Sequence, residues 1–438
     1  MAYLLNLLYV GLLIIASPWL VVSAIRRGKY RTGWGEKFLG LVPRRDSLAP
    51  CAWIHAVSLG EVSLIASLVA EIRRRHPDWH IVISTTTLTG YSLARSRYAQ
   101  YLVFYCPLDF SWAVRRALRR IRPSLLVLAE LELWPNLITE ARRWGAKVAI
   151  VNGRLSDHSF RGYRRFRPLI RCLLAKVDLV AAQNALYAER FLGIGAPPDK
   201  LHVTGSLKFD GANTDRDNPA TVRLRELAGI LPADTVFLAG STQEPEERLA
   251  LEAFRQLAPA HPNLRLIIVP RHPERFDQVA DLLATSGLLW QKRTQVDTSP
   301  FDPRARVLLV DRVGELGAWW GTAKIAYVGG SMGKRQGQNM IEPAAYGAAV
   351  SFGPFTRNFR DVVEALLAGE GAVVVQDGSE LTAFVRRCLD DPQFAEALGA
   401  RARRVVASQL GATARTVDLL DALVARAPSA VDEGRAAA

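Results

Sequence analysis

Short apolar runs alternate with longer amphipathic stretches along almost the whole chain, and this alternation limits the possible fold more than any other feature. The runs have the length of buried strands, and the stretches between them have the period of helices. Before residue 208 the apolar runs are AWIHAVS, HIVISTT, YLVFYC, LLVLAE, KVAIVN and LVAAQN; after residue 220 they are TVFLAGS, LRLIIVP, RVLLV, KIAYVGG, AAVSFG and GAVVVQD. Strands separated by helices form parallel sheets with helices on both faces, so the sequence predicts an α/β fold.

The alternation is interrupted once, by the polar segment KFDGANTDRDNPA at 208–220. A chain of 438 residues also exceeds one ordinary domain. We therefore expect two doubly wound, Rossmann-like domains at 28–207 and 221–425, a linker at 208–220 and a disordered tail at 426–438, with the last helix able to fold back on the first domain. Sheets of this kind bind ligands at the carboxyl ends of their strands, so the pair predicts a central cleft.

The chain begins with an uncharged apolar run, YLLNLLYVGLLIIASPWLVVSAI from Tyr3 to Ile25, and the basic sequence RRGKYR follows it. A helix that crosses a bilayer needs roughly 20 apolar residues, whereas a cleaved signal peptide has its basic residues before the apolar region. The order here favours an uncleaved anchor at 1–27, either spanning the membrane or lying in its interface. Because basic residues mark the cytoplasmic side, we expect the rest of the chain there.

The formal net charge of +14 at pH 7 indicates an anionic partner. Fields of this sign attract nucleic acid, anionic membranes or phosphorylated substrates. Nucleic acid is not expected, because no basic motif has interleaved aromatic residues and an anchor would hold the protein away from it. The arginine cluster FRGYRRFRPLIR at 160–171, together with the arginines at 115–120, suggests contact with anionic headgroups.

Three carboxylates follow predicted strands of the first domain. Glu61 comes after IHAVS, in the first turn of the helix EVSLIASLVAEIRRR, and Glu130 and Glu132 come after LLVLA. Each could simply start a helix, because the helix dipole stabilises a first-turn carboxylate by about 0.3–1 kcal/mol. Each could equally act on a substrate in the cleft, where a general base must lie within reach of a substrate hydroxyl. Lys208, at the domain junction, is either solvated or placed to stabilise negative charge that develops during a reaction.

Two segments of the second half are typical of phosphate binding. VPRHPERF places Pro270 and Arg271 after a strand, and a guanidinium is a planar donor to phosphate or carboxylate. AYVGGSMGKRQGQNMIEPAAYG has glycines after a strand and Glu342 in the first turn of the next helix, an arrangement that brings backbone N–H groups close to an anion. It is not a G-x-x-x-x-G-K-[ST] loop, which disfavours a nucleotide triphosphatase.

Taken together, the motifs HAVSLGE, ELELWPNLI, NGRLS, AAQN, TGSLKFD, VPRHPERF, VGGS and QNMIEPAAYG occur in that order. They resemble the Kdo transferases, the 3-deoxy-D-manno-octulosonic acid transferases of lipopolysaccharide assembly, over nearly the whole chain. The resemblance implies a two-domain GT-B fold anchored on the cytoplasmic face of the inner membrane. It also implies an inverting glycosyltransferase that moves Kdo from CMP-Kdo to a lipid A precursor (lipid IVA). We expect neither a cofactor nor a metal ion.

The resemblance assigns roles to individual residues. The family's general base falls on Glu61, and the residues assigned to transition-state stabilisation fall on Glu130 and Lys208. The expected CMP contacts are Pro270, Arg271, Val313, Gly314, Glu315, Asn339, Met340, Ile341 and Glu342, and the glycine loop adds Gly329, Gly330 and Ser331. Leu131, Gln338 and Met340 depart from the family's usual threonine, histidine and proline, and Met340 affects the expected helix start.

Three other functions fit parts of this pattern. A nucleotide-sugar epimerase would share the two domains and the glycine loop but would not need an anchor. Another nucleotide-sugar glycosyltransferase with a lipid acceptor would keep the anchor and the carboxylates. A membrane-bound module without catalytic activity would bind CMP and tolerate the loss of Glu61.

Overall fold

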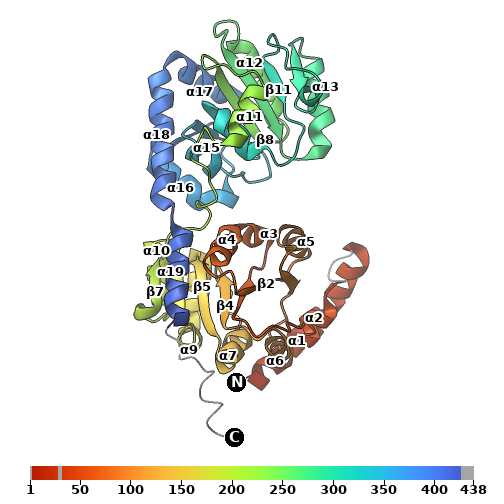
Figure 1. Ribbon diagram of the computed structural model, residues 1–438, viewed down its shortest axis with the longest axis vertical. Coiled ribbons are helices and arrows are strands. Elements are labelled where there is room, and N and C mark those ends of the chain that lie inside the picture. The colour runs from red at the N-terminus through yellow and green to blue at the C-terminus, as the bar shows by residue number, and fades with distance from the viewer. Residues whose placement is uncertain (1, 28–31, 426–438) are drawn as a thin grey trace. The chain divides into compact units, whose positions relative to one another are not determined.

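The computed structural model describes residues 2–27 and 32–425, and these form two compact units, each built on one sheet (Figure 1). The first domain contains the described residues up to Gly211 and those from Leu410 onward, whereas the second domain is the continuous stretch Ala212–Gln409.

The sheet of the first domain has seven parallel strands in the order β3-β2-β1-β4-β5-β6-β7. Its strands are β1 (Cys51–His55), β2 (His80–Thr85), β3 (Leu102–Tyr105), β4 (Leu125–Ala129), β5 (Lys147–Gly153), β6 (Leu179–Ala182) and β7 (Leu201–Val203). Its helices are α1 (Ala2–Arg27), α2 (Trp34–Leu39), α3 (Leu59–Leu64), α4 (Ala66–Arg75), α5 (Leu88–Arg97), α6 (Ser111–Ile121), α7 (Pro135–Arg143), α8 (Asp157–Arg165), α9 (Arg167–Leu174), α10 (Ala185–Gly193) and α19 (Ala412–Ala425).

Successive residues of these strands enter two separate apolar cores, one on each face of the sheet. In β1, Trp53 packs into the core that α6, α7, α9 and α10 complete. Its neighbours Ala52 and Ile54 pack into the opposite core, which α3, α4, α5 and α19 complete. A strand buried on both faces is apolar at every position, which is why the sequence shows continuous apolar runs rather than alternation within each strand.

The second domain repeats this plan with seven parallel strands in the order β10-β11-β9-β8-β12-β13-β14. Its strands are β8 (Thr235–Thr242), β9 (Leu264–Pro270), β10 (Trp290–Lys292), β11 (Val307–Leu309), β12 (Ile325–Val328), β13 (Ala349–Phe352) and β14 (Ala372–Val374). Its helices are α11 (Pro219–Leu227), α12 (Glu246–Leu257), α13 (Phe276–Ala284), α14 (Leu316–Trp319), α15 (Ile341–Ala345), α16 (Arg360–Ala368), α17 (Gly378–Asp390) and α18 (Pro392–Gln409).

The last helix belongs to the first domain, whereas the sequence predicted that the second domain would extend over 221–425. The chain turns at Gly411, which has a φ of 84°, and α19 then packs against α4, β5 and β6 of the first domain. Val417 and Leu420 are buried in the first domain's core. The carboxylate of Asp210 accepts hydrogen bonds from the backbone N–H groups of Gly411 (2.7 Å) and Thr413, which caps the start of α19. The fold-back that the sequence left open therefore occurs.

Helix α1 is held on the first domain by polar contacts, while several of its large apolar side chains are exposed. Asn6 Nδ2 donates a hydrogen bond to Ser111 Oγ at 2.8 Å, and Asn6 Oδ1 accepts one from Ser111 N at 3.0 Å. Leu7 and Ile15, by contrast, are 70% and 78% exposed. No helix within residues 2–27 and 32–425 combines the length and the apolar character that crossing a membrane requires. The anchor at 1–27 stays a prediction, and the predicted tail at 426–438 lies outside the described residues.

Candidate active site

Both sheets reverse their winding direction beside their first strand. In the first domain the strands that follow β1 go to one side as far as β3, and β4 then begins the other side. In the second domain the same reversal falls between β8 and β12. Ligands of open α/β sheets bind outside the carboxyl ends of the strands at this reversal point. We therefore expect functional side chains at the carboxyl ends of β1 and β4 in the first domain and of β8 and β12 in the second.

Glu61 follows β1 at this edge and serves in the cap of α3. Its Oε2 accepts a hydrogen bond from the backbone N–H of Val57 at 2.9 Å, and its Oε1 accepts one from the hydroxyl of Ser58 at 2.8 Å. The Ser58 hydroxyl oxygen in turn accepts a hydrogen bond from the backbone N–H of Glu61, so this is a variant of the capping box. Each carboxylate oxygen still has a free lone pair, and the side chain is half-buried.

Glu130 and Glu132 follow β4 at the other side of the reversal point. The backbone N–H of Glu130 donates to Val151 O at 2.9 Å, and a φ of 59° then turns the chain sharply away from the strand. A left-handed backbone is uncommon for a residue that is not glycine and is found often at functional sites. Trp134 Nε1 donates a hydrogen bond to Glu132 Oε2 at 2.7 Å, which fixes this second acid within the turn.

The charge of Glu130 disfavours the ionisation of Glu61 and of Glu132, and the charge of Glu61 also disfavours that of Glu132. Burial raises the pKa of Glu132 to about 7, and the negative charges of Glu61 and Glu130 add to this shift. The hydrogen bond from Trp134 lowers the pKa and so opposes it. Burial also raises the pKa of Glu61, and Glu130 adds to that shift. The sequence singled out Glu132 as a candidate acid, but the family resemblance assigned it no role. The only available signal was its position two residues after Glu130, which cannot show that its side chain is close to Glu61.

Lys208 reaches the same edge of the sheet through β5. The backbone N–H of Leu207 donates to Asn152 Oδ1 at 3.0 Å, and Asn152 lies near the end of β5, the strand next to β4. The half-buried Lys208 side chain has no ion pair or hydrogen bond within the described chain. The first domain thus brings Glu61, Glu130 and Lys208 to the carboxyl edge of one sheet.

Asp109 is a buried acid that the sequence analysis did not single out. It accepts hydrogen bonds from the backbone N–H groups of Asn136 (3.0 Å) and Leu137 (2.8 Å), at the start of α7, and from the hydroxyl of Tyr9 on α1 (3.0 Å). Burial raises its pKa to about 6. Asp109 therefore connects α1 to the helix that follows the turn containing Glu130 and Glu132.

In the second domain, Arg271 lies at the end of β9 with its guanidinium unpaired within the described chain. Its backbone N–H donates to Thr242 O at 3.0 Å, which places it beside the end of β8. An exposed, unpaired guanidinium at this edge is available to an anionic ligand.

The residues that follow the segment 313–315 lie close to the segment 339–342. Asn339 Nδ2 donates to Glu342 Oε1 at 3.0 Å, and burial raises the pKa of Glu342. A methyl group placed on Gly317, two residues after Glu315, would lie 3.8 Å from Glu342 Oε2. Glu315 forms an ion pair of 3.0 Å with Arg293, which is 1% exposed, so its carboxylate supports this segment. Val313 is exposed.

The glycine loop after β12 differs from the expectation that its backbone N–H groups bind phosphate. Glu246, at the start of α12 and 1% exposed, accepts hydrogen bonds from the backbone N–H groups of Gly330 (2.7 Å), Ser331 (2.9 Å) and Met332 (2.9 Å). The N–H of Gly329 donates to Gly240 O in the sheet. A carboxylate of the protein itself therefore occupies the donors that the sequence assigned to the ligand.

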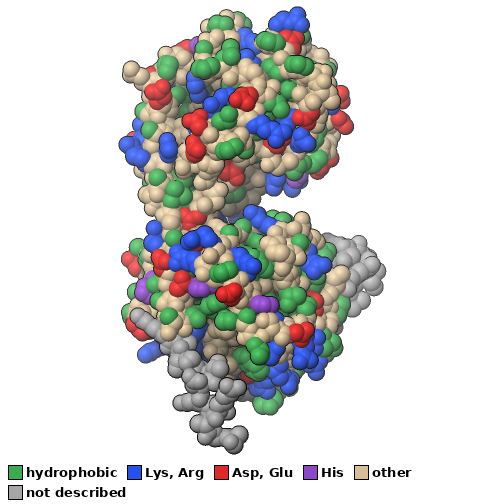
Figure 2. Space-filling model, in the orientation of Figure 1, with side chains coloured by type: hydrophobic (Ala, Val, Ile, Leu, Met, Phe, Trp, Pro, Cys, Tyr) green, Lys and Arg blue, Asp and Glu red, His purple; other side chains and the backbone are tan. Residues whose placement is uncertain are grey.

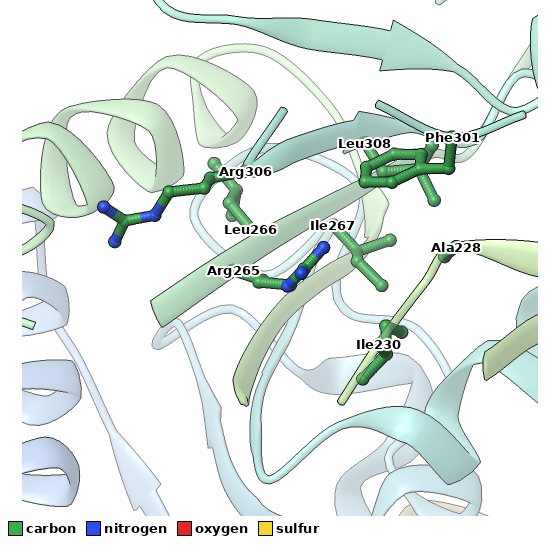
Figure 3. A pocket seen from close by; sticks show the side chains of 8 residues that line it. All are labelled: Ala228, Ile230, Arg265, Leu266, Ile267, Phe301, Arg306 and Leu308. Carbon is green, nitrogen blue, oxygen red and sulfur yellow. The ribbon is translucent and has the colours of Figure 1, made fainter. Parts of the chain in front are cut away.

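A separate pocket of the second domain is too small to bind a substrate. It lies at β9 and β11 and holds about 10 Å³, roughly the space of one water molecule (Figure 3). Its lining residues are Ala228, Ile230, Arg265, Leu266, Ile267, Phe301, Arg306 and Leu308. The candidate functional residues therefore lie at the carboxyl edge of each sheet rather than in this pocket.

Comparisons with known proteins agree on one family. Residues 31–211 match the family model described as 3-Deoxy-D-manno-octulosonic-acid transferase (kdotransferase). The chain is 31% identical over 420 residues to the 3-deoxy-D-manno-octulosonic acid transferase of Haemophilus influenzae, covering 94% of this chain and 97% of that protein. It is 34% identical over 383 residues to the enzyme of the same name from Bordetella pertussis, covering 85% and 87%.

One solved structure shows the same architecture at low sequence identity. The UDP-GlcNAc 2-epimerase of Neisseria meningitidis, bound to UDP-GlcNAc, is 13% identical to this chain and superimposes with a TM-score of 0.56. The match covers 85% of this chain and 100% of the epimerase. At that identity the likeness concerns the fold alone, and it confirms the α/β, GT-B-like architecture of two parallel sheets.

Proposed function

The chain belongs to the 3-deoxy-D-manno-octulosonic acid (Kdo) transferase family, and from this membership we propose that it transfers Kdo from CMP-Kdo to a lipid A precursor during lipopolysaccharide biosynthesis. The observation that supports this reaction best is the group of three carboxylates at the carboxyl edge of the first sheet, the edge that Lys208 also reaches. The membership disfavours an epimerase, whose likeness to this chain lies in its fold.

Glu61 is proposed as the general base that takes the proton from the acceptor hydroxyl as its oxygen attacks the anomeric carbon. Two hydrogen bonds fix its carboxylate and leave a lone pair free on each oxygen. Burial, with a smaller contribution from the charge of Glu130, raises the pKa of Glu61, which makes its carboxylate a better proton acceptor. CMP would leave from the opposite face of the sugar, with inversion.

Glu130 and Lys208 are proposed to stabilise the transition state. Glycosyl transfer develops positive charge on the sugar ring, and a carboxylate at the end of β4 favours that charge. Lys208 would balance the negative charge that collects on the departing phosphate. One phosphate joined directly to the sugar carries less charge than a diphosphate, so the proposal includes no metal ion.

The CMP part of the donor is proposed to bind at the carboxyl edge of the second sheet. Arg271 is exposed there with an unpaired guanidinium, and the half-buried Asn339 and Glu342 lie beside the segment 313–317. Glu342 can accept hydrogen bonds from ribose hydroxyls. Because Glu246 occupies the glycine-loop N–H groups, binding of the phosphate to this domain would depend on Arg271 rather than on that loop.

The lipid nature of the acceptor is supported by the first domain's surface. An open recess of about 280 Å³ lies between α1 and the end of the turn that contains Glu130 and Glu132. Its lining is mainly apolar and consists of Tyr9, Leu12, Leu13, Leu108, Asp109, Phe110 and Trp134. Trp134 also bonds Glu132, so an acyl chain in this recess would bring its headgroup close to the carboxylates.

The protein is proposed to work on the cytoplasmic face of the inner membrane. Helix α1 turns its polar Asn6 toward the protein and its Leu7 and Leu8 outward, which is the reverse of a helix surrounded by water. Basic side chains gather on the first domain over α6 (Figure 2), next to α1. Arg164 and Arg165, at the end of α8, are exposed as well, and each cation near an anionic surface contributes about 1 kcal/mol.

To test the proposal, the purified protein is incubated with CMP-Kdo and tetraacylated lipid A precursor. The mass of the lipid product is then measured by mass spectrometry. We expect one or more Kdo units on the lipid and release of CMP. Hydrolysis or rearrangement of CMP-Kdo without any gain in lipid mass, in the presence of the acceptor, would contradict it. Chelating agents in a parallel reaction test the metal-free mechanism, and transfer should continue at the same rate.

A further inference from the structure

A polar recess of about 360 Å³ opens at the reversal point of the second sheet, between the ends of β8 and β12. Of its lining residues, only Gly330 belongs to the expected CMP contacts. The recess is lined by Gln243, Glu244, Glu246, Gly330, Gly333, Lys334 and Arg335.

The recess presents hydrogen-bond donors that have no partner. Lys334 and Arg335 are exposed at its rim, and neither side chain forms an ion pair or hydrogen bond with any other described residue. Gln243 Nε2 is buried and also has no hydrogen-bond partner in the described structure. Lysine and arginine side chains donate and never accept, so these groups together favour an anion.

The two acids of the recess do not cancel this preference. Glu246 is fully engaged: five donors bond its carboxylate, namely the backbone N–H groups of Gln243, Gly330, Ser331 and Met332 and the hydroxyl of Tyr327. Glu244 is 77% exposed and forms an ion pair with Arg275 at 3.7 Å. Because Glu246 holds the glycine loop through its N–H groups, recognition of an anion here falls to the side chains.

We propose that this recess binds the carboxylate of the donor sugar, with Lys334 and Arg335 as the residues that select an acidic sugar. The inference rests on the proposed function, since an octulosonic acid carries a carboxylate that a neutral sugar lacks. The nucleotide is proposed to contact Arg271 and the segments 313–315 and 339–342, and none of these residues lines the recess, which leaves the recess available to the sugar. A guanidinium and an ammonium that line the same recess match the charge and the two oxygens of a carboxylate.

The test compares Lys334→Met and Arg335→Met with Arg404→Met, which removes an exposed, unpaired arginine from α18. The KM for CMP-Kdo and the inhibition constant of CMP are measured in the full-length protein. Loss of a charge-assisted bond should raise the KM about tenfold or more in each recess variant. CMP inhibition should stay within twofold in all three proteins, which also shows that the second domain remains folded.

Two results would overturn the inference. If CMP inhibition weakens as much as the KM rises, the pair binds the phosphate. If neither quantity changes, the recess plays no part in donor binding. Arg335→Lys should recover part of the affinity, since it restores the charge without the planar fork. The wild-type protein is the reference for the reaction itself. If it does not transfer Kdo, the proposed function is refuted. If it does, the recess variants test the inference separately.

Discussion

Trp134 Nε1 donates a hydrogen bond of 2.7 Å to Oε2 of Glu132, at the place where the chain leaves β4 and enters α7. The bond holds an acid close to two others, Glu61 and Glu130, and burial keeps its pKa at about 7. The first domain therefore contains a carboxylate that changes its charge near physiological pH.

Replacing Glu132 by glutamine should change how stability depends on pH. The pKa of Glu132 is about 7 in the folded protein and 4.5 for an ordinary glutamate, so the folded state binds this proton more tightly. The resulting stabilisation is complete below pH 4.5 and is lost as the pH rises to about 7. Glutamine does not titrate, so Glu132→Gln should gain stability relative to the wild type over this interval. Urea midpoints of both proteins at pH 5 and pH 8 measure the difference, and an unchanged difference would refute the raised pKa.

Replacing Glu61 by glutamine should lower transfer by about 10²–10⁴-fold, the usual contribution of a general base. CMP binding, which is assigned to the second domain, should stay the same. The measurements are initial rates at saturating substrates and calorimetric titration with CMP.

Ser58→Ala is the matched control for Glu61, because it weakens the same helix cap without removing the carboxylate. Its hydroxyl bonds Glu61 Oε1, and the loss of such a cap costs about 1 kcal/mol of stability. Transfer by Ser58→Ala should fall only a few-fold. If it falls as far as in Glu61→Gln, the acid serves the cap alone and is not the base.

Replacing Glu246 by glutamine should destabilise the second domain by about 3 kcal/mol, because buried donors would lose their acceptor. Both oxygens of Glu246 accept from backbone N–H groups, so the amide –NH₂ would face a donor in either orientation. Glu252→Gln, farther along α12 on its exposed side, is the control and should change little. Urea unfolding followed by fluorescence measures both; equal stability of the two variants would argue against the role of Glu246 in holding the loop.

The double variant Leu8→Asn and Ile15→Asn should bind anionic vesicles at least tenfold more weakly than the wild type. Both side chains are exposed on α1, and burying one apolar side chain contributes about 1.5–3 kcal/mol. Flotation with phosphatidylglycerol vesicles measures the bound fraction. Leu231→Asn removes a similarly exposed leucine from the second domain and should leave binding unchanged. Equal flotation of all three proteins would rule out α1 as the contact.

The sequence predicted the interior strands well and missed one edge strand in each sheet. The twelve apolar runs correspond to β1–β6, β8, β9 and β11–β14. The missed strands are β7 and β10, each three residues long, at one edge of its sheet and without a single fully buried position. Edge strands are covered on fewer sides, so they do not need the continuous apolar run that reveals an interior strand.

The candidate site was only partly predictable for a related reason. Positions at strand ends, such as Glu61 and Glu130, can be inferred from the order of apolar runs and turns. The partners of the glycine loop cannot be inferred in this way. Glu246 is 84 residues away from Gly330 in the sequence and contacts it only after β8 and β12 pair. The raised pKa of Glu132 likewise depends on burial and on acids from two different strand ends.

The return of α19 to the first domain decides how the protein can be divided. A gene fragment for residues 212–409 would encode every helix and strand of the second domain in one piece. A fragment ending at residue 211 would leave the surface over β5 and β6 without Val417 and Leu420, and would lack the N–H groups that bond Asp210. If the first domain is produced separately, we therefore expect it to stay soluble only when α19 is added, either as a peptide or through a short fusion.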